Sequence, residues 1–234
     1  DVAISTIISA RRDAYAGYVS PSSVPLGTGI TFPGTVEKYT PVTEEMLLNP
    51  PAADWLMHYQ NYSGWSHSPL KQINAKNIAR LQRAWTFRSG KPGSEATPVV
   101  VDGVLYLTQP NGIFALEPET GKCVWEYELK SGSPATRGLE YWAGDAQSKP
   151  PIGPRLFFGT SNGELIALDA KTGQPATDFG AGGVVDMKAG VMNGYDQIPY
   201  GLSSRPIMYK SLVITGSHTQ EAPMLGSSGD VRAW

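Results

Sequence analysis

The chain has 234 residues, of which only 17% are charged, and its 19 basic and 21 acidic residues give a formal net charge of −2. This balance gives no electrostatic reason to expect nucleic acid or an anionic membrane surface as a partner. The single cysteine, Cys123, excludes an internal disulfide and a cysteine-rich metal site. Glycine and proline are frequent, with 26 and 19 copies, which favours many short strands over long helices.

The N-terminal part of the sequence carries little pattern, and its prolines and glycines predict loop up to residue 34. A short helix is then expected over 44–48, because Thr43 can cap it, two glutamates stand in its first turn and Asn-Pro-Pro follows it. A second short helix is expected over 74–81, with Asn74 as its cap. No other helix is predicted.

From about Trp85 onward, short runs rich in β-formers alternate with turns. Asn-Gly and Asp-Gly dipeptides, which are strong hairpin signals, separate several of these runs at 102–103, 111–112 and 162–163. The expected strands are Ala96–Val101, Val104–Thr108, Ile113–Glu117, Cys123–Glu128, Arg155–Gly159, Leu165–Asp169 and Leu212–Ser217.

An internal repeat organises these strands. The pattern Ala-Leu-(Asp/Glu)-x-x-Thr-Gly begins at Ala115 and again at Ala167, and each copy follows a turn that contains Asn-Gly. A third copy begins at Gly229 and is interrupted at Trp234. A spacing of about 50 residues between units of short strands is typical of β-propeller blades. A β-helix is the alternative, but its turns repeat at a much shorter spacing.

The segment from Ala115 to Trp125, Ala-Leu-Glu-Pro-Glu-Thr-Gly-Lys-Cys-Val-Trp, resembles the tryptophan-docking motif of the quinoprotein dehydrogenases. These enzymes use pyrroloquinoline quinone (PQQ) and form eight-bladed propellers, in which the Trp ring of one blade stacks on a peptide of the next. The second copy has Thr177 in place of this Trp, so we expect no such contact there.

Further segments are similar to the same family. The likeness extends from Tyr39 to the last residue and leaves residues 1–38 unmatched, which divides the chain into an irregular N-terminal extension (1–38) and a partial propeller (39–234) of about three blades with short N-terminal helices. Because the third blade is interrupted, we expect the chain to be a fragment. The segments that carry the likeness lie at 39–57, 62–74, 95–103, 137–142, 158–163 and 229–234.

The resemblance implies a cofactor site made of Glu95, Arg137 and Ser203. Arg137 matches the family arginine that binds PQQ, and a guanidinium can bind a carboxylate through two hydrogen bonds. Glu95 matches a glutamate that hydrogen-bonds the cofactor edge, and Ser203 matches a hydroxyl residue that contacts PQQ. The ordinary alternatives are a surface arginine, a solvated glutamate and a turn serine before Pro206.

The same resemblance implies that Glu221 binds Ca²⁺ or a lanthanide, and an ordinary loop carboxylate is the alternative interpretation. His218 in the same loop could face the cofactor, although a lone histidine is more often incidental. The family aspartate taken as the base lies in later blades, so no catalytic residue is assigned here.

The sequence departs from the family where a group normally stacks on PQQ. The alcohol dehydrogenases carry two adjacent cysteines at the positions of Ser131 and Gly132, and the glucose dehydrogenase branch carries a histidine at the position of Ser133. One face of the cofactor would therefore need another cover.

Two functions follow from these observations. The first is a periplasmic, PQQ-dependent enzyme that oxidises an alcohol or sugar and passes electrons to cytochrome c or ubiquinone, with this fragment inactive alone. The second is a non-catalytic propeller that acts as an interaction scaffold, because a fold does not determine a function.

Overall fold

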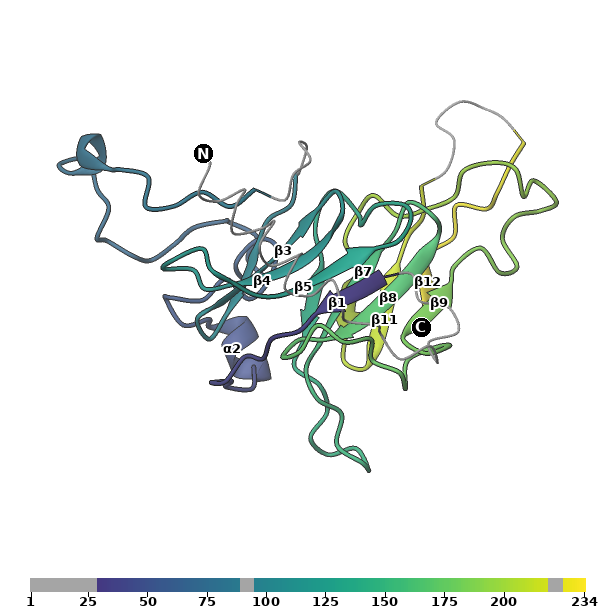
Figure 1. Cartoon of the computed structure of the whole chain (residues 1–234), viewed down its shortest axis with the longest axis horizontal. Helices are drawn as coiled ribbons and strands as arrows, with labels where there is room; N and C mark the ends of the chain where they lie inside the picture. Colours follow the sequence, from purple (N-terminus) through teal and green to yellow (C-terminus); the bar gives the residue numbers. More distant parts are fainter. Residues whose placement is uncertain (1–28, 89–94, 219–224) are drawn as a thin grey trace.

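The computed structural model describes residues 29–88, 95–218 and 225–234. Within these ranges the chain forms three antiparallel sheets, which lie side by side in chain order (Figure 1). A long segment after residue 64 extends away from the sheets. No helix of the described residues combines the length and the apolar character that a membrane crossing requires.

The three sheets differ in their number of strands. The first is five-stranded, in the order β1-β5-β4-β3-β2, the second follows the order β6-β7-β8-β9, and the third follows the order β10-β11-β12. The strands of the first are β1 (Gly29–Phe32), β2 (Val99–Val101), β3 (Val104–Gln109), β4 (Gly112–Leu116) and β5 (Cys123–Leu129). Those of the others are β6 (Glu140–Trp142), β7 (Arg155–Gly159), β8 (Glu164–Asp169), β9 (Val184–Asp186), β10 (Ile207–Tyr209), β11 (Leu212–Thr215) and β12 (Arg232–Ala233).

The predicted hairpins are confirmed. Asp102 and Gly103 join β2 to β3 with φ values of 46° and 74°, and two successive positive φ angles are typical of the turn that matches the twist of a hairpin. The strands predicted from 104 to 128 and from 155 to 169 form within one residue of their expected bounds. The three sheets therefore confirm an all-β, propeller-type fold.

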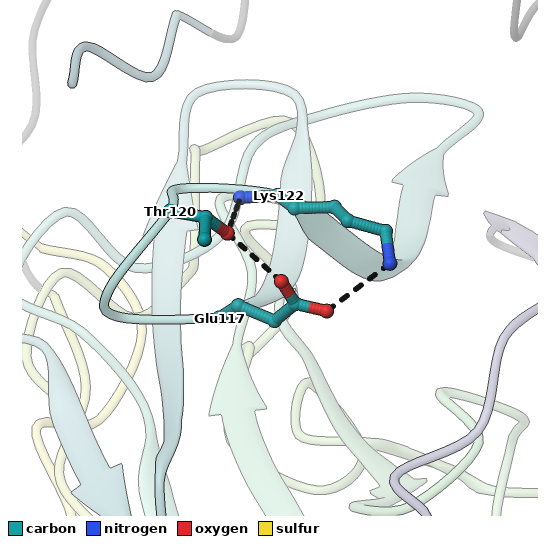
Figure 2. A network of polar contacts seen from close by, with 3 residues as sticks. All are labelled: Glu117, Thr120 and Lys122. Carbon is teal, nitrogen blue, oxygen red and sulfur yellow. Dashed lines mark hydrogen bonds and ion pairs between the residues drawn. The ribbon is translucent and has the colours of Figure 1, made fainter.

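The repeated acidic residue organises the turn that follows the third strand of a blade. In the first copy, Glu117 accepts a hydrogen bond from the Thr120 hydroxyl at 2.8 Å and pairs with the Lys122 ammonium at 3.2 Å (Figure 2). In the second copy, Asp169 Oδ1 accepts the backbone N–H and the hydroxyl of Thr172. The motif is thus a side-chain-bonded turn, which explains its Asp/Glu and Thr positions.

The glycine of this turn lets the preceding sheet approach. Gly173 has φ of 69°, and a Cβ at this position would lie only 2.5 Å from the Trp125 ring. Trp125 is 1% exposed and its indole N–H donates to the Ala170 carbonyl at 3.1 Å, where the Tyr106 hydroxyl also donates at 3.0 Å. The first sheet is therefore bound to the turn of the second by an aromatic side chain and two hydrogen bonds.

Trp85 makes the same contact with the turn of the first sheet. Its indole N–H donates to the Pro118 carbonyl at 2.9 Å, and a Cβ on Gly121 would meet its ring at 2.6 Å. Pro118 and Gly121 occupy the repeat positions of Ala170 and Gly173. The sequence interpretation missed this second use of the repeat, because Trp85 stands far from the turn that it contacts.

The second sheet has both faces buried because it lies between two others. Along β7, Leu156 and Phe158 belong to the core shared with the first sheet, whereas Phe157 belongs to the core shared with the third. This division follows the two-residue period of a strand. All five residues of β7 are buried, as expected for a strand covered on both faces.

Of the two helices expected in the N-terminal part, one is confirmed and the other is wrong. The helix α2 (Glu44–Leu48) forms as predicted, and the Thr43 hydroxyl accepts the backbone N–H of Met46 at 3.2 Å. The helix expected over 74–81 is wrong, because only a short 3-10 helix forms at Ile78–Arg80. Asn74 instead binds nearby backbone groups with its own side chain, which competes with helical hydrogen bonds.

The strands that the sequence interpretation missed or misplaced are short. Residues 29–32 were expected to be loop, but they form β1, which pairs with β5. Ala96–Val101 is a strand only from Val99, since Pro98 has no N–H to donate to a partner. Leu212–Ser217 ends at Thr215. Thr177, which stands at the repeat position of Trp125, lies in a turn before β9. Counted from the Thr-Gly of the repeat, β9 begins later than β5, the fourth strand of the first sheet.

The Trp125–Gly173 contact can be tested with two glycines of similar conformation. Gly173 and Gly182 have φ values of 69° and 71°, but a Cβ on Gly182 would have no neighbour within 4 Å. We expect Gly182→Ala to cost about 1 kcal/mol through the left-handed backbone alone. Gly173→Ala should cost about 1–3 kcal/mol more, because its Cβ collides with the indole. Urea unfolding of the full chain measures both, and equal losses would contradict the contact.

Candidate functional site

The structure places three of the predicted site residues at equivalent positions of the three sheets. Glu95 precedes β2, Arg137 precedes β6 and Ser203 precedes β10, each by a few residues. These strands are the first of their sheets, and each forms an edge of its sheet. The edge strands β6 and β10 are in contact with each other. The segments that carry the three residues are therefore brought together by the repeated order of the sheets.

Backbone hydrogen bonds connect the three segments. The Glu95 N–H donates to the Thr136 carbonyl at 3.3 Å, and the Arg137 N–H donates to the Ser203 carbonyl at 3.2 Å. Arg137 Nε lies 3.9 Å from Glu95 Oε2. Residues separated by more than 100 positions in the sequence thus form one cluster, and Arg137 is its centre.

The charged side chains of this cluster remain open to solvent. Arg137 is 60% exposed and Glu95 is 73% exposed, so their long ion pair contributes little to stability. Such a pair leaves the guanidinium free to bind an anion. An exposed guanidinium of this kind can bind the carboxylate of a small ligand.

The predicted metal ligand Glu221 lies outside the described residues. His218, the last described residue before it, lies near the cluster, because its N–H donates to the Gly201 carbonyl at 2.8 Å, two residues before Ser203. The imidazole of His218 is exposed. Among residues 29–88, 95–218 and 225–234, no group of three or more His, Cys, Asp or Glu side chains could hold a metal ion.

The segment 131–133, for which the resemblance implies no stacking group, is bound to the β7–β8 turn. The Asn162 side-chain amide donates to the Ser131 hydroxyl at 3.1 Å, and the Ser133 N–H donates to the Ser161 hydroxyl at 3.0 Å. Gly132 has φ of 73°, and a Cβ on it would lie 2.7 Å from the Asn162 side chain. Asn162 therefore occupies the space that a side chain at position 132 would need.

The sequence interpretation missed a buried ion pair next to this cluster. Glu140, the first residue of β6, contacts Arg205, and both side chains are mostly buried, at 12% and 19% exposure. A cavity of about 750 Å³ that is open to solvent lies beside the pair, and neither Glu95, Arg137 nor Ser203 lines it. A single carboxylate within the run Leu139-Glu-Tyr-Trp142 was the available signal, because an isolated charge in an apolar strand needs a partner.

Burial raises the pKa of Glu140 to about 7, although Arg205 and the Met208 N–H both act to lower it. Since the folded-state pKa exceeds the unfolded value, the folded protein favours the protonated acid. The contribution of Glu140 to stability is thus fully present below about pH 4.5 and is lost as the pH rises through 7.

We therefore expect the stability of the wild-type protein relative to Glu140→Gln to decline between pH 4.5 and 7 and to level off above 7. Urea unfolding of both proteins across this range measures the difference, in which the other titrating groups cancel. A difference that increases with pH would contradict the expectation and show that attraction to Arg205 outweighs burial.

The comparisons with known proteins agree with this architecture. The family model for the glucose/ethanol/alcohol dehydrogenase β-propeller domain, named for PQQ, matches residues 55–234. The quinoprotein glucose dehydrogenase of Escherichia coli (strain K12) is 30% identical over 99% of this chain and 30% of its own length. Methanol dehydrogenase (cytochrome c) subunit 1 of Paracoccus denitrificans is 33% identical over 78% of this chain and 28% of its own.

Solved structures show the same likeness. A quinohemoprotein alcohol dehydrogenase from Pseudomonas putida HK5 superposes with a TM-score of 0.61 and 27% identity, over 76% of this chain and 25% of that one. A europium-containing methanol dehydrogenase gives a TM-score of 0.61 and 26% identity, over 82% and 32%. The chain thus spans about a third or less of the length of these proteins. Since the family match covers all three sheets except β1, the chain belongs to the β-propeller domain of the PQQ-dependent glucose/ethanol/alcohol dehydrogenase family.

Proposed function

We propose that this chain supplies part of the PQQ site of a dehydrogenase that oxidises an alcohol or sugar to the carbonyl product. The observation that carries the proposal is the cluster of Glu95, Arg137 and Ser203, which lies before the first strands of three successive sheets. PQQ is a flat tri-acid with an ortho-quinone, so its site needs a cation for a carboxylate and polar groups for the remaining edge. The cluster offers one exposed guanidinium, one carboxylate and one hydroxyl.

The cofactor, when bound, supplies the two-electron redox chemistry, and the protein binds and orients it. Arg137 would hold a PQQ carboxylate through its guanidinium, and Ser203 would hydrogen-bond an oxygen of the ring system. Glu95 would accept a hydrogen bond from the cofactor edge. None of these residues is assigned as the base that takes the substrate proton.

We further propose Ca²⁺ or a lanthanide as the associated metal ion and Glu221 as one of its ligands. An oxygen ligand suits both kinds of hard cation, and the likeness to a europium-containing methanol dehydrogenase supports the lanthanide alternative. Electrons would leave to cytochrome c or to a quinone. The name of the relative methanol dehydrogenase (cytochrome c) supports the first acceptor. A quinone is supported by the name of a second relative, the alcohol dehydrogenase (quinone) of Gluconobacter oxydans (strain 621H), which is 39% identical over 52% of this chain and 16% of its own length.

The role of Arg137 is tested by PQQ binding. In the full-length dehydrogenase to which this chain would contribute, Arg137→Ala should weaken PQQ binding about tenfold to a hundredfold, because a hydrogen bond between charged groups contributes about 1.5–3 kcal/mol. The PQQ affinity of Arg137→Lys should lie between that of the wild type and that of Arg137→Ala, since lysine keeps the charge and loses the bidentate geometry. Titration followed by quinone absorbance measures the affinities, and dye reduction with ethanol or glucose reports activity.

The matched control is Arg80→Ala, which removes an exposed arginine from the 3-10 helix and should leave PQQ binding unchanged. If the wild-type full-length dehydrogenase binds no PQQ and reduces no dye with any alcohol or sugar, the enzyme proposal is wrong. The scaffold function would then be the better interpretation.

The role of Glu221 is tested by metal dependence. In the full-length dehydrogenase, Glu221→Gln should raise the Ca²⁺ concentration needed for half-maximal dye reduction at least about tenfold, because an amide is a weaker ligand than a carboxylate. Glu119→Gln, at an exposed glutamate of the first Thr-Gly turn, serves as the control. Equal calcium requirements for both variants would contradict a ligand role for Glu221.

A further inference from the structure

The ion pair of Glu140 and Arg205 joins the second sheet to the third. Its partners are the first residue of β6 and a residue just before β10. Among the ion pairs between described residues, it alone has both side chains at least four-fifths buried. The side chains of Lys122 and Glu117 are 66% and 41% exposed, and Asp178, which pairs with Arg155, is 62% exposed.

Three contacts connect the segment 137–140 with the segment 203–208. The Arg137 N–H donates to the Ser203 carbonyl at 3.2 Å. The Glu140 carboxylate accepts from the Arg205 guanidinium and from the Met208 backbone N–H. Glu140 is three residues after Arg137, and Arg205 is two residues after Ser203. The members of the ion pair are therefore only two or three residues along the chain from the proposed cofactor-site residues Arg137 and Ser203.

The pair is placed to determine geometry more than stability. Removing two charges from water costs free energy that their attraction often fails to recover, so apolar residues could join two sheets at least as firmly. A guanidinium and a carboxylate, however, meet in a narrow range of distances and angles. A binding site also loses affinity when its groups move by a fraction of an ångström from the productive arrangement.

We propose that Glu140 and Arg205 are positioning residues that set the separation of Arg137 and Ser203 for the cofactor. The inference rests on the proposed function, because it assigns these residues a role in the same site. They act through the segments that they join and do not touch the cofactor. Without the pair, the side chains of Arg137 and Ser203 would still be present, but the second and third sheets could shift against each other.

The test compares the PQQ affinity of three variants of the full-length dehydrogenase: two double variants of the pair and one single control variant. Glu140→Ala/Arg205→Ala removes both charges and should weaken PQQ binding about tenfold, which corresponds to 1.4 kcal/mol. The exchanged pair, Glu140→Arg/Arg205→Glu, should recover most of the affinity, because it restores a charged contact between the same segments. Asp178→Asn is the matched control, since it breaks an ion pair within the second sheet only.

Recovery by the exchanged pair would show that the contact between the two segments, and not either residue alone, sets the affinity. A loss of affinity in a variant that remains fully folded is the result that a purely structural defect would not give. If the alanine variant does not fold, Glu140→Gln and Arg205→Lys keep similar size and should each show a smaller loss in the same direction. Circular dichroism and urea unfolding verify that each variant is folded. PQQ binding as tight as wild type in the folded pair variants would overturn the inference, and so would an equal loss in Asp178→Asn.

The outcomes also separate this inference from the proposed function. Loss of binding in Arg137→Ala together with unchanged binding in the pair variants would overturn only the positioning role. Failure of the wild-type full-length dehydrogenase to bind PQQ would overturn the proposed function, and the positioning role with it.

Discussion

The structure depends on the contact between Trp125 and the turn that ends at Gly173. A sheet of three or four short strands cannot cover its own faces, so each one needs a neighbour on either side. The indole fills this need and also donates a hydrogen bond to the Ala170 carbonyl. Apolar burial and hydrogen bonding thus act at one point, and the same contact recurs where Trp85 meets the preceding turn.

The position of the candidate site follows from this packing. Repetition of one unit brings the same part of each sheet to the same place, so the segments before the first strands converge. A cluster built in this way takes one side chain from each unit, and no single unit contains a recognisable site. This explains why Glu95, Arg137 and Ser203 stand so far apart in the sequence yet lie on segments that share backbone hydrogen bonds.

The two junctions between sheets differ in chemistry. Aromatic side chains such as Tyr106 and Trp125 dominate the first junction, whereas a buried ion pair of Glu140 and Arg205 is part of the second. The polar junction lies beside the segments of the candidate site. Burial raises the pKa of the Glu140 carboxyl to about 7. Keeping this carboxylate charged at the second junction therefore costs free energy of folding.

The sequence by itself determined the fold class, the repeat, the longer strands and the family, because each is encoded in local patterns such as strand alternation, Asn-Gly turns and the acidic-x-x-Thr-Gly motif. It could not show the three-residue strands β6 and β10, which are too short to carry a period and exist because neighbouring chain pairs with them. The sequence pattern also predicted a helix at 74–81, where the Asn74 side chain instead forms hydrogen bonds with nearby backbone groups. Only the tertiary structure decided which residues meet: Trp85 with its turn, Arg137 with Ser203 and Glu140 with Arg205. Contacts between distant residues depend on how the sheets pack, and no local pattern contains that information.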